Sequence, residues 1–179
     1  MKYIASFQLA VKLGLGCCLL PTSFSKAETF LSRDQAQQAI WKDTKFKLVD
    51  IQLTKEQIKL IKSRVKTKVN SNFKAYKSID GSWFIVDQVV GKHEYIDMAV
   101  GITSTGVIKD VEILTYRETY GGQIRNVNWL KQFFGRNHKE ILKLDKQIKN
   151  ISGATLSCKH VTQGVNKLNQ IWYEVLRHH

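Results

Sequence analysis

The chain has 179 residues, 43% of them apolar, which suffices for one hydrophobic core but is too short for two large domains. Its formal charge is +13; the first 27 residues hold three lysines and no acid, which leaves +10 for the rest. A basic chain suits nucleic acid, an anionic membrane or an acidic protein, but the lysines form no stripe and no nucleic-acid-binding motif is present, so nucleic acid is not expected as a partner.

Residues 1–27 have the pattern of a cleaved secretory signal peptide. Lys2 and Lys12 precede a short apolar run, and Ser25 and Ala27 place small residues at positions −3 and −1 before Glu28. The apolar run falls short of the roughly 20 residues that a membrane span needs. We therefore expect a periplasmic protein with one mature domain, residues 28–179. A lipoprotein is the alternative, since a Gly-Cys pair occurs at residues 16–17.

Cleavage of that segment would also remove two cysteines and leave Cys158 as the only thiol, so no internal disulfide is expected. Cys158 has two interpretations: a thiol activated near a helix start, or a small residue packed beside the turn. The five histidines show no spacing typical of metal ligands apart from the terminal pair His178 and His179. No metal site is expected.

Two amphipathic helices are expected early in the mature chain. The first begins at Ser32 as its N-cap, and the second at Thr54, which fits a capping box with Gln57. Apolar residues recur at helical spacing in both segments: Ala36, Ile40 and Trp41, then Ile58, Ile61 and Val65.

From residue 72 the hydrophobic period changes. Segments 82–90, 94–103 and 107–118 are rich in β-branched and aromatic residues and are joined by short turns. They predict an antiparallel meander of three or more strands, and together with the helices an α+β fold. Strict alternation in the third segment would place Ile113 on one face and Leu114 and Tyr116 on the other.

The third strand runs into the loop YRETYGGQIRN, residues 116–126. An acid, an aromatic residue and a Gly-Gly pair at the end of a strand make a loop whose backbone can approach a flat ligand closely. A plain turn from a strand to a helix would have the same composition.

The remaining segments are expected to be mainly helical. Residues 126–134 predict a helix with Trp129 on its apolar side, either in the core or stacked on a flat ring. Residues 138–150 predict a short helix followed by a connecting strand. The closing helix carries a regular apolar stripe, which should face the core: Val161, Val165, Leu168, Trp172 and Val175.

The run SGATLS stands at the start of that closing helix. It predicts a tight turn that offers hydroxyls, free backbone N–H groups and the positive end of a helix dipole, which together suit a phosphate. Alternatively, Thr155 or Ser157 only caps the helix. The six residues of the run are Ser152, Gly153, Ala154, Thr155, Leu156 and Ser157.

The run SGATLS followed by an amphipathic helix resembles the flavinylation motif of the FMN-binding domain family. That family includes flavoprotein subunits of sodium-pumping NADH:quinone oxidoreductases and of the Rnf electron-transport complex. The resemblance implies FMN as the cofactor, joined by a phosphoester to Thr155 and placed there by a separate FAD-dependent flavin transferase. It also implies that Glu118, Tyr120 and Gly121, in a loop where the family has Glu-Thr-Pro-Gly, are neighbours of the flavin. The family has an Asp three residues before the Ser of SGAT, where this chain has Lys149.

On these grounds we expect an exported flavoprotein that relays electrons between membrane-associated donor and acceptor proteins, rather than a stand-alone enzyme. Lys159 and His160, early in the closing helix, could offset the charge of a phosphodiester. The rival from another class is an exported binding module that holds a phosphate-bearing or anionic ligand at the same turn without redox chemistry. A third option is a small-molecule reductase with noncovalent FMN.

Overall fold

The computed structural model describes residues 28–179, so the expected signal peptide lies outside the described residues. In this part of the chain six antiparallel strands form one sheet in the order β1-β6-β5-β4-β3-β2. The strands are β1 Glu28–Thr29, β2 Phe46–Gln52, β3 Asn72–Ser78, β4 Trp83–Val90, β5 Tyr95–Ile102 and β6 Ile108–Tyr116. The helices are α1 Arg33–Trp41, α2 Lys55–Arg64, α3 Val127–Leu130 and α4 Thr155–Glu174, with 3-10 turns η1 Gly122–Arg125, η2 Lys131–Phe133 and η3 Leu176–His178. The predicted α+β class is confirmed.

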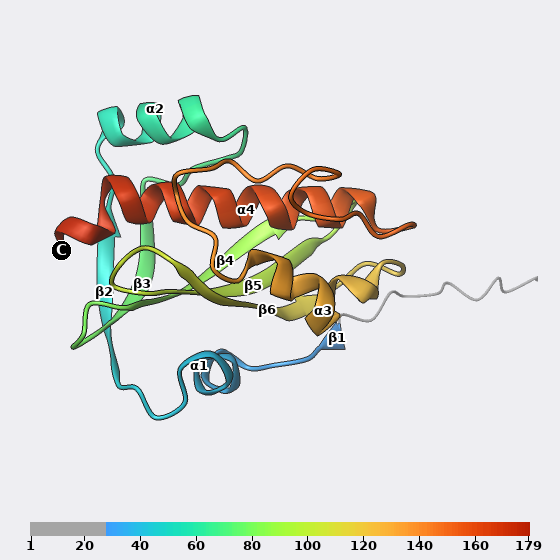
Figure 1. The fold of residues 1–179 in the computed structure, drawn as a ribbon, viewed down its shortest axis with the longest axis horizontal. Coiled ribbons are helices and arrows are strands. Elements are labelled where there is room, and N and C mark those ends of the chain that lie inside the picture. The colour runs from blue at the N-terminus through green and yellow to red at the C-terminus, as the bar shows by residue number, and fades with distance from the viewer. Residues whose placement is uncertain (1–27) are drawn as a thin grey trace, which may run out of the picture.

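The elements are stacked in layers around the sheet. Helix α4 lies across one face, α1 lies on the opposite face, and α2 lies beyond α4 (Figure 1). Helix α4 can approach the sheet closely because Gly164 has no side chain: a Cβ there would come within 2.7 Å of Val89. A buried ion pair of 2.6 Å between Lys167 and Asp87 also joins α4 to β4. The start of α4 is thereby fixed relative to the sheet.

The core lies mainly between α4 and the sheet. The expected stripe of α4 is buried throughout, from Val161 to Val175. A second, smaller cluster under α1 contains Trp41, Phe84 and Leu114. Burial of each large apolar side chain contributes about 1.5–3 kcal/mol relative to exposure, so the regular stripe accounts for the position of the longest helix.

Both early helices begin where the sequence predicts. Ser32 Oγ accepts from Gln35 N, and the Gln35 side chain accepts from Ser32 N. Thr54 and Gln57 form the same reciprocal pair at the start of α2. Each capping box satisfies two N–H groups that would otherwise have no partner at a helix end.

The strict alternation expected along β6 is wrong, because the pairing of β5 with β6 shifts twice. Met98 is opposite Ile113, whereas its neighbour Asp97 is opposite Thr115, so Leu114 is an extra residue in β6. Ile113 and Tyr116 consequently share the core on the α4 side, while Leu114 joins the cluster under α1. This bulge aims the Tyr116 side chain at the start of α4.

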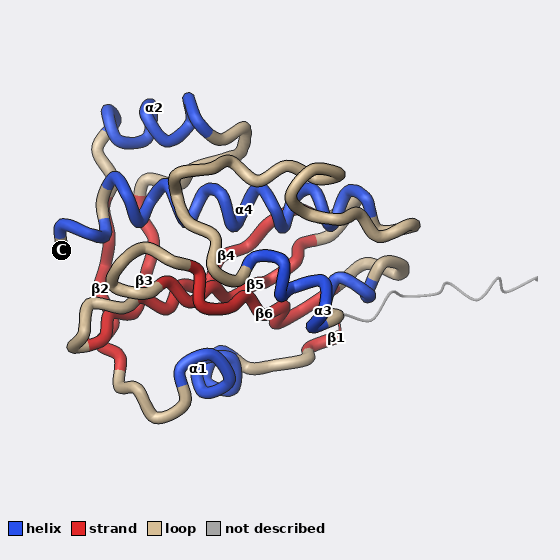
Figure 2. The backbone as a smooth tube through the Cα atoms, in the orientation of Figure 1, coloured by secondary structure: helices blue, strands red, loops and turns tan. Residues whose placement is uncertain are grey.

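Several elements differ from the sequence-based expectation. Strands β1, β2 and β3 lie outside the three predicted segments. Residues 126–134 form a four-residue helix and a 3-10 turn instead of one helix. Residues 138–150, the strap hereafter, form neither the expected helix nor a strand (Figure 2). Asn166 of α4 holds the strap, because its side chain donates to Leu142 O (2.8 Å) and accepts from Leu142 N (2.9 Å). These tertiary hydrogen bonds replace local helical ones.

Candidate cofactor site at the start of α4

The SGATLS run forms the predicted tight turn and helix start. Ala154 N donates to Ile151 O at 3.0 Å, Gly153 has φ +81°, and the first helical bond runs from Cys158 N to Ala154 O at 2.9 Å. Within the described residues no side chain caps this end of α4. The first N–H groups of the helix, from Thr155 onward, therefore have no helical acceptor and are available to an anion.

The hydroxyls of the run do not act as helix caps. Thr155 is exposed, and its Oγ1 accepts from Asn150 Nδ2 at 3.1 Å. Ser157 is buried, and its Oγ lies 3.1 Å from the Tyr116 hydroxyl. Thr155 thus lies at the surface with its hydroxyl bonded to one amide, whereas Ser157 belongs to the interior.

Tyr116 connects β6, the loop after it and α4. Its hydroxyl donates to Tyr120 O, so Ser157 donates to the Tyr116 oxygen. Burial raises the pKa of Tyr116, although the bond from Ser157 opposes this, so the phenol stays a donor at neutral pH. Gly121 has φ +93°, and a Cβ on it would lie 2.6 Å from the Tyr116 hydroxyl and 3.0 Å from Ala154 Cβ. The loop therefore packs directly on the SGAT turn.

Glu118 ties the same loop to the turn between β4 and β5. Its Oε1 accepts from His93 N at 2.6 Å and Glu94 N at 3.0 Å. Burial acts to raise the pKa of Glu118, but the backbone N–H donors outweigh it and hold the pKa below its usual value. The carboxylate stays ionised and fixes residues 91–94 beside the start of α4. His160 of α4 supports this turn through Nδ1, 3.0 Å from Gly91 O.

These segments enclose a cleft of about 600 Å³, a volume within the range of small-molecule sites. It is lined by Lys92, His93, Glu118, Thr119, Tyr120, Gly153, Ala154, Thr155, Leu156 and Ser157. The structure thus brings two predicted segments, the loop and the SGAT turn, to one place. Ser152 and Gly121 are not part of the lining, and Gly121 serves to pack the loop. Sequence reasoning missed Lys92 and His93, which a tertiary carboxylate contact places here.

The cleft combines an anion site with apolar surface. Lys92 and His93 are exposed beside the open helix end. Tyr120 is 81% exposed and Leu156 is 41% exposed, so both offer apolar surface to a ligand in the cleft. Such a lining suits a ligand with a phosphate at one end and a flat apolar ring at the other, which is the chemistry of FMN.

Other candidate residues lie outside this cleft. Trp129 is buried against Phe133, and its Nε1 donates to Lys149 O at 2.7 Å, which favours the core interpretation. Cys158 is fully buried, and burial raises its pKa, which favours the packing interpretation. Lys159 lines a different cavity. Residues 28–179 contain no group of three acidic, His or Cys residues able to hold a metal ion.

Comparison with known proteins identifies the cofactor. Residues 91–170 match the FMN-binding domain family, so every residue lining the cleft lies inside the match. The match indicates FMN as the cofactor. Across residues 28–179, no helix of the FMN-binding protein is long and apolar enough to cross a membrane.

One known protein is similar to this chain in sequence, and another is similar in structure. The chain is 34% identical over 86 residues to one subunit of the Na⁺-translocating ferredoxin:NAD⁺ oxidoreductase complex of Acetobacterium woodii, covering 43% of this chain and 42% of that relative. The chain thus spans under half the length of this relative. The crystal structure of NqrC from Shewanella oneidensis has the same fold, with a TM-score of 0.51 at 15% identity, covering 78% of this chain and 82% of that one.

Proposed function

We propose that the chain is an exported flavoprotein that relays electrons between redox partners, with FMN joined by a phosphoester to Thr155 Oγ1. The observation that carries the proposal is that exposed Thr155 lines the cleft at an uncapped helix start inside the FMN-binding match. A threonine that only capped the helix would turn its oxygen toward the backbone N–H groups.

Attachment would be a transfer reaction carried out by a separate flavin transferase with FAD. Thr155 Oγ1 would form a bond to the phosphorus of the FMN half, the bond to AMP would break, and the hydroxyl proton would be lost. Asn150 Nδ2 donates to Oγ1 and so positions the oxygen without occupying its proton. The product carries one negative charge on the phosphodiester, next to the N–H groups at the start of α4.

Residues of the cleft would hold the rest of the cofactor. Lys92 and His93 would offset the phosphodiester charge, while Tyr120 and Leu156 would cover apolar ring surface. Glu118 would act indirectly, because it fixes the turn that carries Lys92 and His93. Bound FMN would supply the electron-transfer chemistry itself, and the protein would supply position and electrostatics.

The partners of the reaction follow from the relative named above, which is a subunit of a sodium-translocating redox complex. By analogy, we propose membrane-associated donor and acceptor proteins, with the formal charge of +10 on residues 28–179 favouring acidic ones. The signal-peptide pattern in residues 1–27 supports export to the periplasm. The intact mass of protein from the periplasmic fraction tests the proposed export. It should equal the mass of a chain that begins at Glu28.

The attachment is tested by intact mass and in-gel flavin fluorescence after co-expression with a flavin transferase. The wild type should gain the mass of FMN less one water and remain fluorescent after denaturation. Thr155→Val should lose both signals. Thr119→Val makes the same chemical change at another exposed residue of the cleft and should keep them.

Lys149→Asp restores the acid of the family pattern and should raise the flavinylated fraction if the transferase reads this position. Colour lost on dialysis would show that FMN is bound but not covalently. A colourless protein with no added mass, with or without Lys149→Asp, would contradict the proposal and favour the non-redox binding module.

A further inference from the structure

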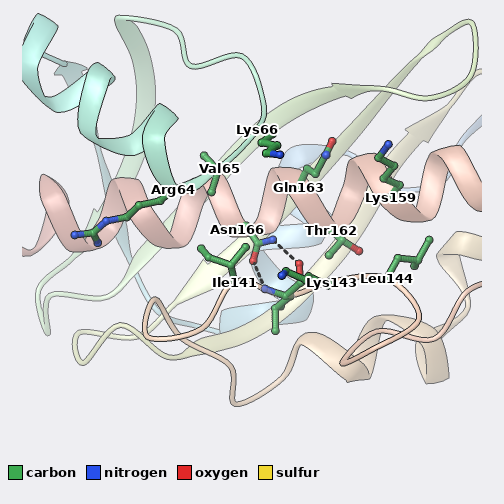
Figure 3. Close-up of a pocket in the computed structure, with 11 residues that line it drawn as sticks. Arg64, Val65, Lys66, Ile141, Lys143, Leu144, Lys159, Thr162, Gln163 and Asn166 are labelled. Atoms are coloured by element: carbon green, nitrogen blue, oxygen red, sulfur yellow. Dashed lines mark hydrogen bonds between the residues drawn. The ribbon is translucent and has the colours of Figure 1, made fainter.

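A second cavity of about 520 Å³ opens on the outer side of α4. Figure 3 shows α4 running between the end of α2, which carries Arg64, Val65 and Lys66, and the strap, which carries Ile141, Lys143 and Leu144. Helix α4 contributes four residues to the lining: Lys159, Thr162, Gln163 and Asn166. This cavity shares no lining residue with the cofactor cleft.

The interior of this cavity is apolar. Val65 and Leu142 are buried core residues that line it, and Ile141 and Leu144 are partly buried against the same core. The buried polar side chains in the lining are already satisfied: Thr162 Oγ1 donates to Cys158 O at 2.7 Å, and the Asn166 amide is paired with the backbone of Leu142. They therefore demand no hydrogen bond from an occupant.

The rim of the cavity is basic. Lys66, Lys143 and Lys159 are exposed, and within residues 28–179 none of the three has an ion-pair partner. Arg64 differs, because it bonds Gln170 Oε1 at 2.8 Å and pairs with Glu174 at 3.0 Å. Among the described residues no Asp or Glu lines the cavity. Three unpaired cations around an apolar interior leave positive charge uncompensated where a ligand would enter.

We propose that this cavity binds a small amphiphile that has an anionic head group on an apolar chain. Its chain would lie on Val65, Leu142 and Leu144, and its head group would meet Lys66, Lys143 and Lys159. An inorganic anion would leave the apolar lining wet, and a neutral or cationic amphiphile would leave the lysines unpaired. The proposal does not depend on the flavin, because the two sites are built from different residues.

The test uses decanoate, titrated calorimetrically into the purified protein below its micelle-forming concentrations. Acetate has the same carboxylate without a chain, and decyltrimethylammonium has the same chain with the opposite charge. Decanoate should bind at least about tenfold more tightly than either. Backbone amide chemical shifts should change at Leu142 and Thr162, and Thr155→Val should leave the affinity unaltered.

Two triple variants with equal loss of charge localise the site. Lys66→Gln, Lys143→Gln and Lys159→Gln combined should weaken decanoate binding about tenfold. Lys55→Gln, Lys59→Gln and Lys62→Gln combined, on the exposed side of α2, should change it less than about twofold. Because all six lysines are exposed, folding should survive, which circular dichroism checks. Equal loss in both variants, equal binding of acetate or of the cation, or no binding of decanoate would each overturn the proposal.

Discussion

The starts of the described long helices differ in how their backbone N–H groups are satisfied. Helices α1 and α2 are closed by the capping boxes of Ser32 and Thr54. Helix α4 is the longest of them and begins beside three hydroxyl residues, yet no side chain in the described part of the chain caps it. Its hydroxyls point elsewhere: that of Thr155 to Asn150 and that of Ser157 to Tyr116.

This contrast separates folding from ligand binding. A side-chain cap stabilises a helix by about 1 kcal/mol, and α4 has no such cap at the end that faces the cleft. The burial of its apolar stripe keeps the helix stable without the cap. The free N–H groups then remain available for the phosphate of FMN, which would cap the helix in place of a side chain.

The largest effect is expected where the loop packs on the open helix end. Gly121→Ala would force a Cβ onto the Tyr116 hydroxyl and into a positive φ. We expect a loss of about 2–4 kcal/mol in the free energy of unfolding, together with weaker FMN binding. Urea denaturation and flavin content measure the two. Gly122→Ala is the matched control, since a Cβ there would meet no atom within 4 Å; an equal loss in this control would contradict the packing argument.

Tyr116→Phe removes the hydroxyl that joins the loop to α4. Buried Ser157 would lose its acceptor and Tyr120 O its donor. The expected cost is about 1–2 kcal/mol, with a lower flavinylated fraction because the loop is no longer held to the turn. Thermal unfolding and flavin fluorescence provide the readouts. An unchanged flavin content would show that the loop does not shape the cleft.

Thr54→Ala removes the side-chain cap at the start of α2 and so tests the difference between the capped start of α2 and the uncapped start of α4. It should lower the free energy of unfolding by about 1 kcal/mol and leave flavinylation unaltered. Thr155→Val should do the reverse, with a change in stability within about 0.5 kcal/mol and complete loss of covalent flavin. Chemical denaturation and in-gel fluorescence of the two variants side by side decide whether the two helix starts have different tasks.

Glu118→Gln tests the carboxylate that orders the turn at residues 91–94. Because the folded pKa of Glu118 is lowered, its stabilising contribution is complete above the unfolded pKa of about 4.3 and is lost as the pH falls through the folded value. The variant should therefore be less stable than wild type at pH 7, by about 0.5–1 kcal/mol, and this difference should shrink as the pH falls below about 4. Denaturant midpoints at several pH values check this; a difference that does not change with pH would point to the shape of the side chain and not to its charge.

Leu156→Glu should have the smallest effect on stability, but stability and FMN binding should change in opposite directions. A carboxylate in the first turn of α4 interacts favourably with the helix dipole and should stabilise the apo protein by about 0.3–1 kcal/mol. The same charge would repel the phosphate and lower FMN binding. Leu156→Gln, which is polar but uncharged, should change both stability and FMN binding less than Leu156→Glu does. A variant in which FMN binding rises with stability would contradict the anion-site assignment.

Much of the fold can be predicted from local sequence signals. The N-cap Ser32 and the capping box at Thr54 locate α1 and α2, the β-branched and aromatic content between short turns locates β4 to β6, and the apolar stripe locates α4. Strand β2 escapes detection because it is an edge strand, in which only Ile51 is fully buried. The strap was wrongly predicted as helix and strand, because its conformation depends on Asn166, a residue 24 positions from its partner Leu142.

The candidate site likewise has parts that local sequence signals predict and parts that depend on tertiary contacts. The SGAT turn and the loop at residues 118–121 can be recognised from sequence, because each is a local motif. Lys92 and His93 cannot, since they reach the cleft through the contact between Glu118 and the turn after β4. The separation of Thr155 from Ser157, one exposed and one buried, likewise depends on where the Tyr116 hydroxyl lies.

The position of that hydroxyl is determined by the bulge at Leu114. If all residues of β6 alternated regularly, without the bulge, the side chains beyond Ile113 would be out of phase, and Tyr116 would point to the layer under α1. Deletion of Leu114 itself would keep Thr115 and Tyr116 opposite Asp97 and Ile96, so Tyr116 would stay on the α4 side and the cluster under α1 would lose one side chain. An irregularity in strand pairing, remote in sequence from the SGAT turn, thus decides which face of the sheet presents the hydroxyl that joins the loop to α4.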